Sequence, residues 1–283
     1  MKPAFLSACT MIKGGAAWKQ LPEWVAYHRL LGVEHFYIYV NEHIPNLLDP
    51  KSSTIKDFLA NTPLSQHVTF IPFQDDLGRF QMQTVQLADC LHRGRGQSEW
   101  VMMNDVDEYF QVMTNASSTT TMNSLSHFLK TILEDGSVPN KLGAIQAKNL
   151  YFYRKYSINV IKEISNKTVS LEQRKCPKLW KREKKQPLVT SSNNTTVELY
   201  PYSSNEATDR GREKSVHRPW YAIFPSPHRL ESGERLLMDP ATQLRSSHFK
   251  YALNGKCIVH ELISDSSLAH RFGPQIRNIL YPN

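Results

Sequence analysis

The first 110 residues alternate between short apolar runs and segments whose apolar residues have helical spacing. Residues 3–12 (PAFLSACTMI) are small and apolar almost throughout, which is typical of a strand buried on both faces. Residues 21–32 carry apolar and aromatic residues at helical spacing and end on Gly32, which predicts an amphipathic helix with a glycine C-cap. Residues 33–40 (VEHFYIYV) are rich in β-branched and aromatic residues, and they predict a second strand.

The same alternation continues to residue 104. It predicts a short helix over 54–60, a third strand over 67–73 (HVTFIPF), a long helix over 80–94 and a fourth strand over 99–104 (EWVMMN). The apolar face of the long helix is expected to contain Val85, Leu87, Cys90 and Leu91. Strands that alternate with helices indicate an α/β fold, a three-layer sandwich with a mostly parallel central sheet. In such sheets ligands bind at the carboxyl ends of the strands.

The second half of the chain has a different character. Residues 142–156 predict one or two strands, but the following residues are dominated by Lys, Glu, Ser, Asn and Thr. We interpret 183–213 as long surface loops or an insertion within one domain. Ordered segments are expected again over 214–228 and 241–252.

Composition and charge narrow the class of protein. The chain has 283 residues, is 40% hydrophobic and carries a formal charge of +8, so it can bury a large core and favours an anionic partner. That partner could be nucleic acid, a membrane surface or a phosphorylated small molecule. The basic stretch KLWKREKK has a single aromatic residue and no nucleic-acid-binding motif beside it, which favours a solvated loop over a nucleic-acid site.

Cysteines and glycosylation sequons bear on the compartment. The cysteines are Cys9, Cys90, Cys176 and Cys257. They form no Cys-x-x-Cys pair, and they could be four buried thiols, which we slightly favour, or two disulfides. Asn-x-Ser/Thr sequons begin at Asn115, Asn166, Asn193 and Asn194, and they weakly favour a secretory compartment, although chance explains them equally well. No apolar run approaches the roughly 20 residues that span a bilayer, so we expect a soluble protein or one whose anchor lies outside this chain.

The fourth predicted strand runs into three carboxylates, Asp105, Asp107 and Glu108. In an extended segment, a spacing of two puts Asp105 and Asp107 on the same face. Two such carboxylates repel each other unless a cation lies between them, and Mg²⁺ or Mn²⁺ suits oxygen ligands together with phosphate. The alternatives are a solvated strand end, a helix N-cap, or a haloacid-dehalogenase-like phosphatase. The phosphatase is disfavoured because its Asp-x-Asp follows the first strand, not the fourth.

Several residues farther along the chain could complete such a site. His228 and His248 each end an apolar or aromatic run, and either imidazole could be a further metal ligand. Lys214, Arg218 and Arg229 flank ordered segments near His228, where they could contact a diphosphate. His28 and His35 are interpreted as structural.

Four segments of the chain together resemble family 92 glycosyltransferases. They are LPEWVAYHRLLGVEHFYIYVNE, QTVQLADCLHRGRGQSEWVMMNDVDEYF, KSVHRPWYAIFPSPH and SSHFKYA, and they occur in the family's order from about residue 5 to residue 252. The resemblance implies a GT-A fold, a UDP-sugar donor such as UDP-galactose, a glycan acceptor, a divalent metal (usually Mn²⁺) and inversion at the anomeric carbon. It also implies a Golgi or other secretory-pathway membrane location on the lumenal face. Residues 1–112 would then form the nucleotide-sugar-binding half, and 113–283 the acceptor side.

Carried onto this chain, the resemblance assigns Asp105 and Asp107 to the metal, with Asp107 as the more direct ligand. It assigns His228 or His248 as the C-terminal ligand, whereas Glu23, Trp24 and His28 would position a strand. Two departures from the family pattern are MIKGGAAWKQ in place of the usual Lys-Asn-Glu loop and the lack of a Gly-rich segment after residue 162. The catalytic base is unassigned, and Glu172 and Asp209 are guesses. The competing hypothesis is a non-catalytic relative that binds carbohydrate or a polyanion.

Overall fold

The computed structural model describes residues 3–12, 15–41, 63–73, 79–113, 122–153, 195–200, 202–204, 213–226, 228, 230–249, 262–265 and 267–281. The chain divides into two compact units, one made of residues 1–149 and 208–247 and the other of residues 150–207 and 248–283. Each unit is described by itself. The predicted helix over 54–60, the sequons, Cys176, Cys257, and most of the polar stretch 183–213 lie outside the described residues.

The first unit is built on a mixed, mostly parallel sheet. Its parallel strands are β1 (Ala4–Ile12), β2 (His35–Val40), β3 (Val68–Pro72) and β4 (Ser98–Met103). The strands lie in the order β6-β8-β4-β1-β2-β3, where β8 (Lys214–His217) is antiparallel to both β4 and β6 (Leu142–Tyr153). Strand β11 (Glu234–Leu237) pairs with β6, and β12 (Leu244–Phe249) pairs with β5 (Glu108–Val112). The short strands β9 (Phe224–Pro225) and β10 (Leu230–Ser232) form a hairpin. The predicted α/β fold with a mostly parallel sheet is confirmed.

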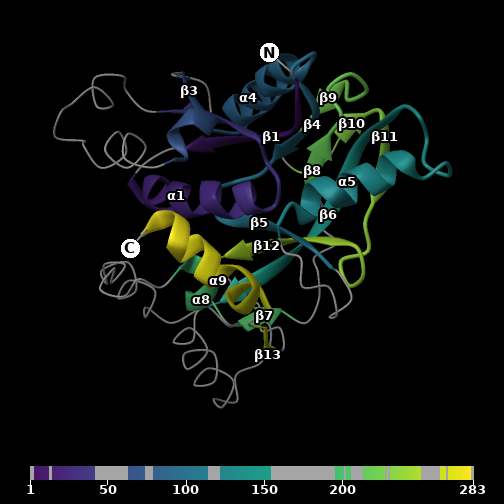
Figure 1. Ribbon diagram of the computed structural model, residues 1–283. Helices are drawn as coiled ribbons and strands as arrows, with labels where there is room; N and C mark the ends of the chain where they lie inside the picture. The colour runs from purple at the N-terminus through teal and green to yellow at the C-terminus, as the bar shows by residue number, and fades with distance from the viewer. Residues whose placement is uncertain are drawn as a thin grey trace, which may run out of the picture. The chain divides into compact units, whose positions relative to one another are not determined.

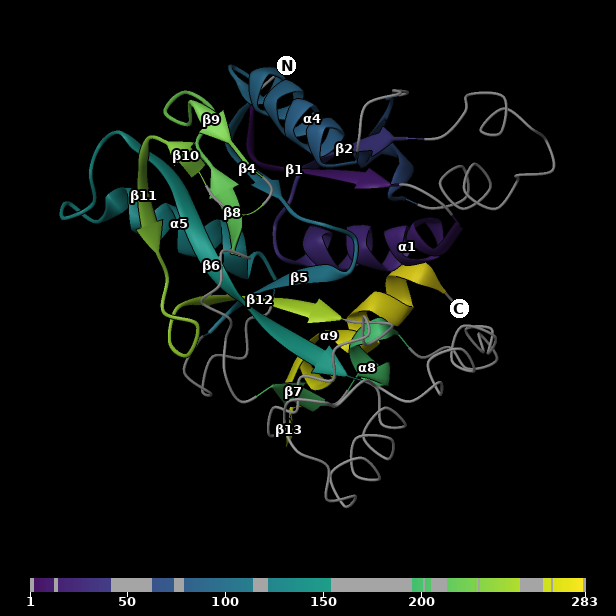
Figure 2. The same ribbon diagram turned by 180° about the vertical axis from the view of Figure 1, so that it is seen from behind.

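Helices cover both faces of this sheet (Figures 1 and 2). Helix α4 (Arg79–Gly94) packs its buried residues against one face of β1, β2 and β4. Helix α1 (Gly15–Leu30) lies on the opposite face, where Trp24 packs edge-on against Phe36 at 5.7 Å between ring centroids. The two helical layers and the sheet therefore bury a continuous core, as the alternation of strand and helix patterns predicts.

The end of α1 shows how local sequence fixes the chain direction. Gly32 has φ 99°, and the Gly32 and Val33 amides donate to the Arg29 and His28 carbonyls at 3.1 and 3.0 Å. This pattern is a Schellman motif, in which glycine adopts the left-handed conformation without steric cost. The predicted glycine C-cap is confirmed. The helix begins at Gly15, whereas residue 21 was predicted, because an alanine-rich turn precedes the periodic segment.

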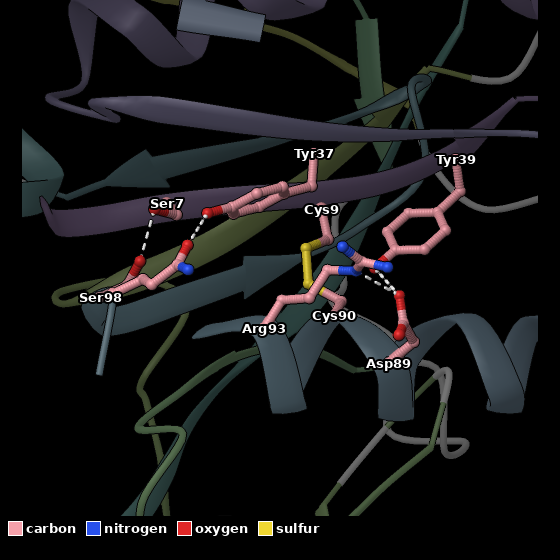
Figure 3. Close-up of a disulfide and its surroundings, with 9 residues drawn as sticks. Ser7, Cys9, Tyr37, Tyr39, Asp89, Cys90, Arg93 and Ser98 are labelled. Atoms are coloured by element: carbon pink, nitrogen blue, oxygen red, sulfur yellow. Dashed lines mark hydrogen bonds and ion pairs between the residues drawn. A yellow bond between two sulfur atoms is a disulfide. The ribbon is translucent and has the colours of Figure 1, made fainter. Parts of the chain in front are cut away.

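Helix α4 confirms the predicted helix over 80–94 but corrects two details. Leu87, Cys90 and Leu91 are buried, whereas Val85 is 48% exposed and lies outside the apolar face. Cys90 is joined to Cys9 of β1 in a disulfide with a Cα–Cα distance of 6.4 Å, so the preference for thiols was wrong for this pair (Figure 3). The bridge joins α4 to the central strand of the sheet.

Polar side chains surround the disulfide (Figure 3). Asp89 of α4 accepts a hydrogen bond from the Tyr39 hydroxyl at 2.6 Å and forms an ion pair with Arg93 at 2.6 Å. Burial, followed by the hydrogen bond to Asp89, raises the pKa of Tyr39 well above its usual range. These contacts tie α4 to β2 as the disulfide ties it to β1.

Several elements of the first unit were not predicted, and β5 and α5 are two of them. Strand β5 follows directly on the acidic segment, and all of its residues are buried. Helix α5 (Ser124–Glu134) starts against the end of α1, where the Leu125 and Ser126 amides both donate to the Leu31 carbonyl at 3.2 Å. The spacing of Leu125 and Leu129, both buried, was the available sequence signal for α5.

The second unit contains the C-terminal end of β6, the strands β7 (Tyr202–Ser204) and β13 (Leu262–Ser264), and the helices α8 (Thr196–Leu199) and α9 (Ser267–Leu280). Strand β7 is antiparallel to both β6 and β13. Glu198 caps α8 by accepting the Thr195 amide at 2.8 Å, and it also pairs with Arg277 of α9. Among the described residues, no helix combines the length and apolar composition needed to cross a membrane.

Candidate functional site

The acidic segment forms a tight turn between two buried strands. Strand β4 ends at Met103, residues 106 and 107 form a turn, and β5 begins at Glu108, whose amide donates to the Asp105 carbonyl at 3.0 Å. Asp105 and Asp107 therefore do not lie on an extended strand, and the premise from which a shared face was predicted was wrong. Their location at the carboxyl end of β4 is as predicted.

Helix α1 and β4 hold this turn through buried hydrogen bonds to β5. The Trp24 indole donates to the Glu108 carbonyl at 3.1 Å, and the Asn104 amide donates to the same carbonyl at 2.5 Å. The Tyr27 hydroxyl donates to the Phe110 carbonyl at 2.7 Å. Each bond satisfies a backbone oxygen that the turn would otherwise leave unpaired in the interior. The aromatic residues of α1 thus fix the position of the acidic segment.

Two histidines of the first unit are fully buried and neutral. Nδ1 of His28 donates to the Trp24 carbonyl at 2.8 Å. Burial lowers the pKa of His28 to about 3, although this hydrogen bond by itself would raise it. Burial also lowers the pKa of His217 in β8 to about 4. Because both imidazoles are uncharged and enclosed, they belong to the structural frame of the site. His35, which pairs with the Thr69 hydroxyl at 2.9 Å, also has a structural contact.

Lys214 lies at the centre of the acidic turn. Its Nζ is 2.8 Å from Oε2 of Glu108 and 3.1 Å from Oδ2 of Asp105. The Lys214 and Glu108 side chains are each 2% exposed, whereas the Asp105 side chain is 44% exposed. Oε2 of Glu108 also accepts the Asp105 amide at 3.0 Å, and Gln83 of α4 donates to Oδ1 of Asp105 at 3.3 Å. We call these four residues, Gln83, Asp105, Glu108 and Lys214, the lysine clamp.

The charge of Lys214 is stabilised by its neighbours. Burial by itself would lower the pKa of Lys214, but Coulombic attraction to Asp105 and Glu108 and hydrogen bonds to both outweigh it, so the pKa is raised above its usual value. The ammonium is therefore a permanent cation at physiological pH. Asp107, which is also partly exposed, adds a third carboxylate to this turn.

A small recess opens beside Asp105 at the carboxyl ends of β1 and β4. Its volume is about 10 Å³, enough for about one water molecule. Its walls include Thr10, Gln83, Gln86, Asn104, Asp105 and Lys214. Oγ1 of Thr10, Nε2 of Gln86 and Oδ1 of Asn104 are buried and have no hydrogen-bond partner among the described residues. Since buried polar atoms are rarely left unpaired, this edge is suited to a polar ligand.

The donor set suits a hard divalent cation. Asp105 and Asp107 are both partly exposed, and they present carboxylate oxygens of the kind that Mg²⁺ and Mn²⁺ prefer. Glu108 is buried and its Oε2 pairs with Lys214, and one of its carboxylate oxygens lies within 4.8 Å of an oxygen of Asp107.

The structure does not bring all of the predicted site residues together. Because β8 is antiparallel to β4, Lys214 lies near Asp105, whereas Arg218 lies at the other end of the strand. There Arg218 binds Oε1 of Glu99 through Nε at 3.1 Å and Nη2 at 2.9 Å, away from the carboxylates. Lys214, also predicted to contact a diphosphate, is instead enclosed by two carboxylates.

The remaining predicted residues stay predictions. His228 is partly buried just after β9, and His248 lies in β12, where its ring is 5.2 Å from that of Tyr151 within the second unit. Arg229, Glu172 and Asp209 lie outside the described residues. Sequence reasoning did not identify Gln83 as a contact of Asp105, although it is the first residue of the matching segment QTVQLADC.

Comparison with known proteins gives a consistent picture. The model of a family described as glycosyltransferase family 92 matches residues 5–229. A glycosyltransferase family 92 protein of Ricinus communis is 36% identical over 114 residues, which cover 40% of this chain and 18% of that protein. A β-1,4-galactosyltransferase of Caenorhabditis elegans is 29% identical over 92 residues, covering 32% and 21%. A galactan β-1,4-galactosyltransferase of Arabidopsis thaliana is 24% identical over 177 residues, covering 60% and 34%. The matches thus span about a fifth to a third of these relatives.

Proposed function

Because this chain belongs to glycosyltransferase family 92, we propose that it transfers a hexose from a UDP-sugar to a glycan acceptor with inversion at the anomeric carbon. The hexose that we propose is galactose. Support for galactose comes from the names of two relatives, a β-1,4-galactosyltransferase and a galactan β-1,4-galactosyltransferase. The basic balance of the chain suits an anionic donor, and no nucleic-acid partner is proposed.

One observation carries the proposal: the carboxyl end of β4 holds two partly exposed carboxylates, Asp105 and Asp107, beside a small polar recess. Asp105 and Asp107 would hold Mn²⁺ or Mg²⁺ there, with His228 or His248 as a further ligand. When bound, the cation would neutralise the donor diphosphate and make it a better leaving group. Asp107 has the more direct role in this proposal, as the family resemblance implies, while Asp105 also binds Lys214 and Gln83.

The transfer itself needs a proton acceptor from the chain. In an inverting reaction, the acceptor hydroxyl oxygen forms a bond to the anomeric carbon while the bond from that carbon to the diphosphate oxygen breaks. UDP leaves with the electron pair, and a carboxylate takes the hydroxyl proton. Glu172 and Asp209, the two guesses for this base, lie outside the described residues, so the base stays unassigned.

We also propose a secretory-pathway location, with the domain on the lumenal face of the Golgi or a related membrane. The Cys9–Cys90 disulfide supports this location, because such bridges persist in oxidising compartments and are rare in the cytosol. An anchor outside this chain would supply the membrane attachment.

Calorimetric titration with UDP, with and without Mn²⁺, tests the proposal. We expect metal-dependent binding that is lost in Asp107→Ala and retained in the control Glu134→Gln, which removes an exposed carboxylate at the end of α5. His228→Ala and His248→Ala, measured in the same way, identify the further ligand. Absence of metal-dependent UDP binding in the wild type would refute the transferase. UDP binding without UDP release from UDP-galactose across a glycan panel would favour the non-catalytic alternative.

A further inference from the structure

Lys214 is poorly placed to contact a substrate. Its side chain is 2% exposed, and its ammonium lies between Glu108 at 2.8 Å and Asp105 at 3.1 Å. A buried ammonium that already neutralises a buried carboxylate would have to break both pairs before it could reach a diphosphate in solvent. Separating the two partners of a buried ion pair leaves an uncompensated charge in the interior, which is strongly unfavourable.

We propose that Lys214 is a positioning residue of the metal site: it acts through Asp105 and Glu108 and does not touch the donor. This inference rests on the proposed function, since it concerns the same carboxylate edge. In a solvated turn, water would bind the Asp105 carboxylate. Here the buried Lys214 ammonium binds it and fixes its orientation.

The geometry of the lysine clamp supports this role. Oδ2 of Asp105 binds Lys214 while Oδ1 accepts from Gln83, so β8 and α4 hold the carboxylate from two sides. Oε2 of Glu108 accepts both the Lys214 ammonium and the Asp105 amide, which closes the turn on itself. Each carboxylate oxygen has two lone-pair directions, so Asp105 can keep these bonds and still offer an oxygen to a cation.

The sign of the effect on metal affinity separates positioning from simple charge. Coulomb's law predicts that removal of a cation next to two carboxylates tightens the binding of Mn²⁺. Loss of positioning predicts the opposite, because residues that orient metal ligands typically contribute about 10- to 100-fold to metal affinity. Lys214→Met removes the ammonium and keeps most of the aliphatic stem.

The experiment measures Mn²⁺ binding to the purified chain by electron paramagnetic resonance of the free ion, with urea unfolding to verify that each variant is folded. We expect Lys214→Met to bind Mn²⁺ at least about tenfold more weakly than the wild type. The control Lys130→Met removes an exposed lysine that lies over Phe5 at the amino end of β1, and its affinity should match the wild type. Equal or tighter binding by Lys214→Met would overturn the inference.

The double variant Lys214→Met/Glu108→Gln separates positioning from stability. It removes the buried carboxylate together with its counter-ion, so the urea midpoint should recover toward the wild type while Mn²⁺ binding stays weak. Wild-type Mn²⁺ affinity in the double variant would mean that Lys214 acts through stability alone, and the positioning role would be wrong. Absence of Mn²⁺ binding in the wild type would instead remove the proposed function and this inference with it.

Discussion

The Cys9–Cys90 disulfide allows a quantitative prediction about stability. The bridge joins β1 to α4 across a sequence separation of 81, and both sulfurs are enclosed in the core. In the chain-entropy model, closing a loop of this length lowers the entropy of the unfolded chain by about 15 cal/mol/K, which corresponds to about 4.5 kcal/mol at 25 °C. Native-state relaxation reduces such values, and a loss of about 2–4 kcal/mol is the usual range.

Three variants measured by urea unfolding test this value: Cys9→Ala, Cys90→Ala and the double variant. If the bridge forms, either single change removes it completely, so all three variants should lose nearly the same free energy. Wild-type protein equilibrated with dithiothreitol should unfold at the same urea midpoint as the double variant. Peptide mapping without reductant should recover the segments around Cys9 and Cys90 as one linked species.

Packed thiols would give a different result. Each alanine change would then cost roughly 1 kcal/mol for the lost apolar contact, the two costs would add, and reductant would leave the wild-type midpoint unchanged. That outcome would refute the assignment of the bridge and remove one argument for the secretory compartment.

Two further predictions follow from the backbone and the buried imidazoles. Gly32→Ala should lower the free energy of unfolding by more than about 2 kcal/mol, because φ is 99° and a Cβ would lie 2.3 Å from Oγ of Ser126. The control Gly96→Ala, with φ 76° and open space around the Cβ, should lose only the part that comes from backbone strain. Equal losses of the two variants in urea unfolding would contradict the predicted clash. His28 and His217 have folded pKa values of about 3 and about 4, below the unfolded value of 6.5, so the unfolded chain binds more protons and stability should fall as the pH drops below about 6.5. The expected loss between pH 7 and pH 5 is about 2 kcal/mol for each histidine. The urea midpoint should therefore fall less in His217→Leu than in the wild type, and a midpoint independent of pH would contradict the burial of both rings.

The sequence predicted those elements whose periodicity is local. The first four strands and the helices around Trp24 and Leu87 were predicted because each carries its own apolar pattern, and burial in the structure follows that pattern. Strand β5 was missed because its apolar residues continue directly from the acidic turn, without a glycine or proline to separate the two.

The position of Asp105 in the fold was predicted, but the geometry around it was not. The alternation of elements was enough to put Asp105 at the carboxyl end of β4, whereas the turn at Asp105 depends on Lys214, which is 109 positions away in the chain. The direction of β8 likewise decides that Lys214 and Arg218 lie at opposite edges of the sheet, and no local pattern reveals that strand β8 is antiparallel to β4.

The matching segments carried the family without revealing what each residue does. In QTVQLADC, Gln83 contacts Asp105, Asp89 accepts from Tyr39, and Cys90 forms the disulfide. These partners come from β1, β2 and the acidic turn. The spacing of the motif therefore reflects which positions of α4 face the sheet and the turn. A motif of this kind identifies relatives, but the role of each of its residues can be assigned only from its contacts in the folded structure.

Strand β8 has a consequence for the order in which the protein can be made. It lies between β4 and β6, yet it is synthesised after both, and it brings the counter-ion of Glu108. A nascent chain that has left the ribosome only as far as residue 149 therefore lacks the strand between β4 and β6 and the Lys214 partner of Glu108. The sheet that contains β1 to β4 and β6 is therefore completed only after Lys214 has emerged.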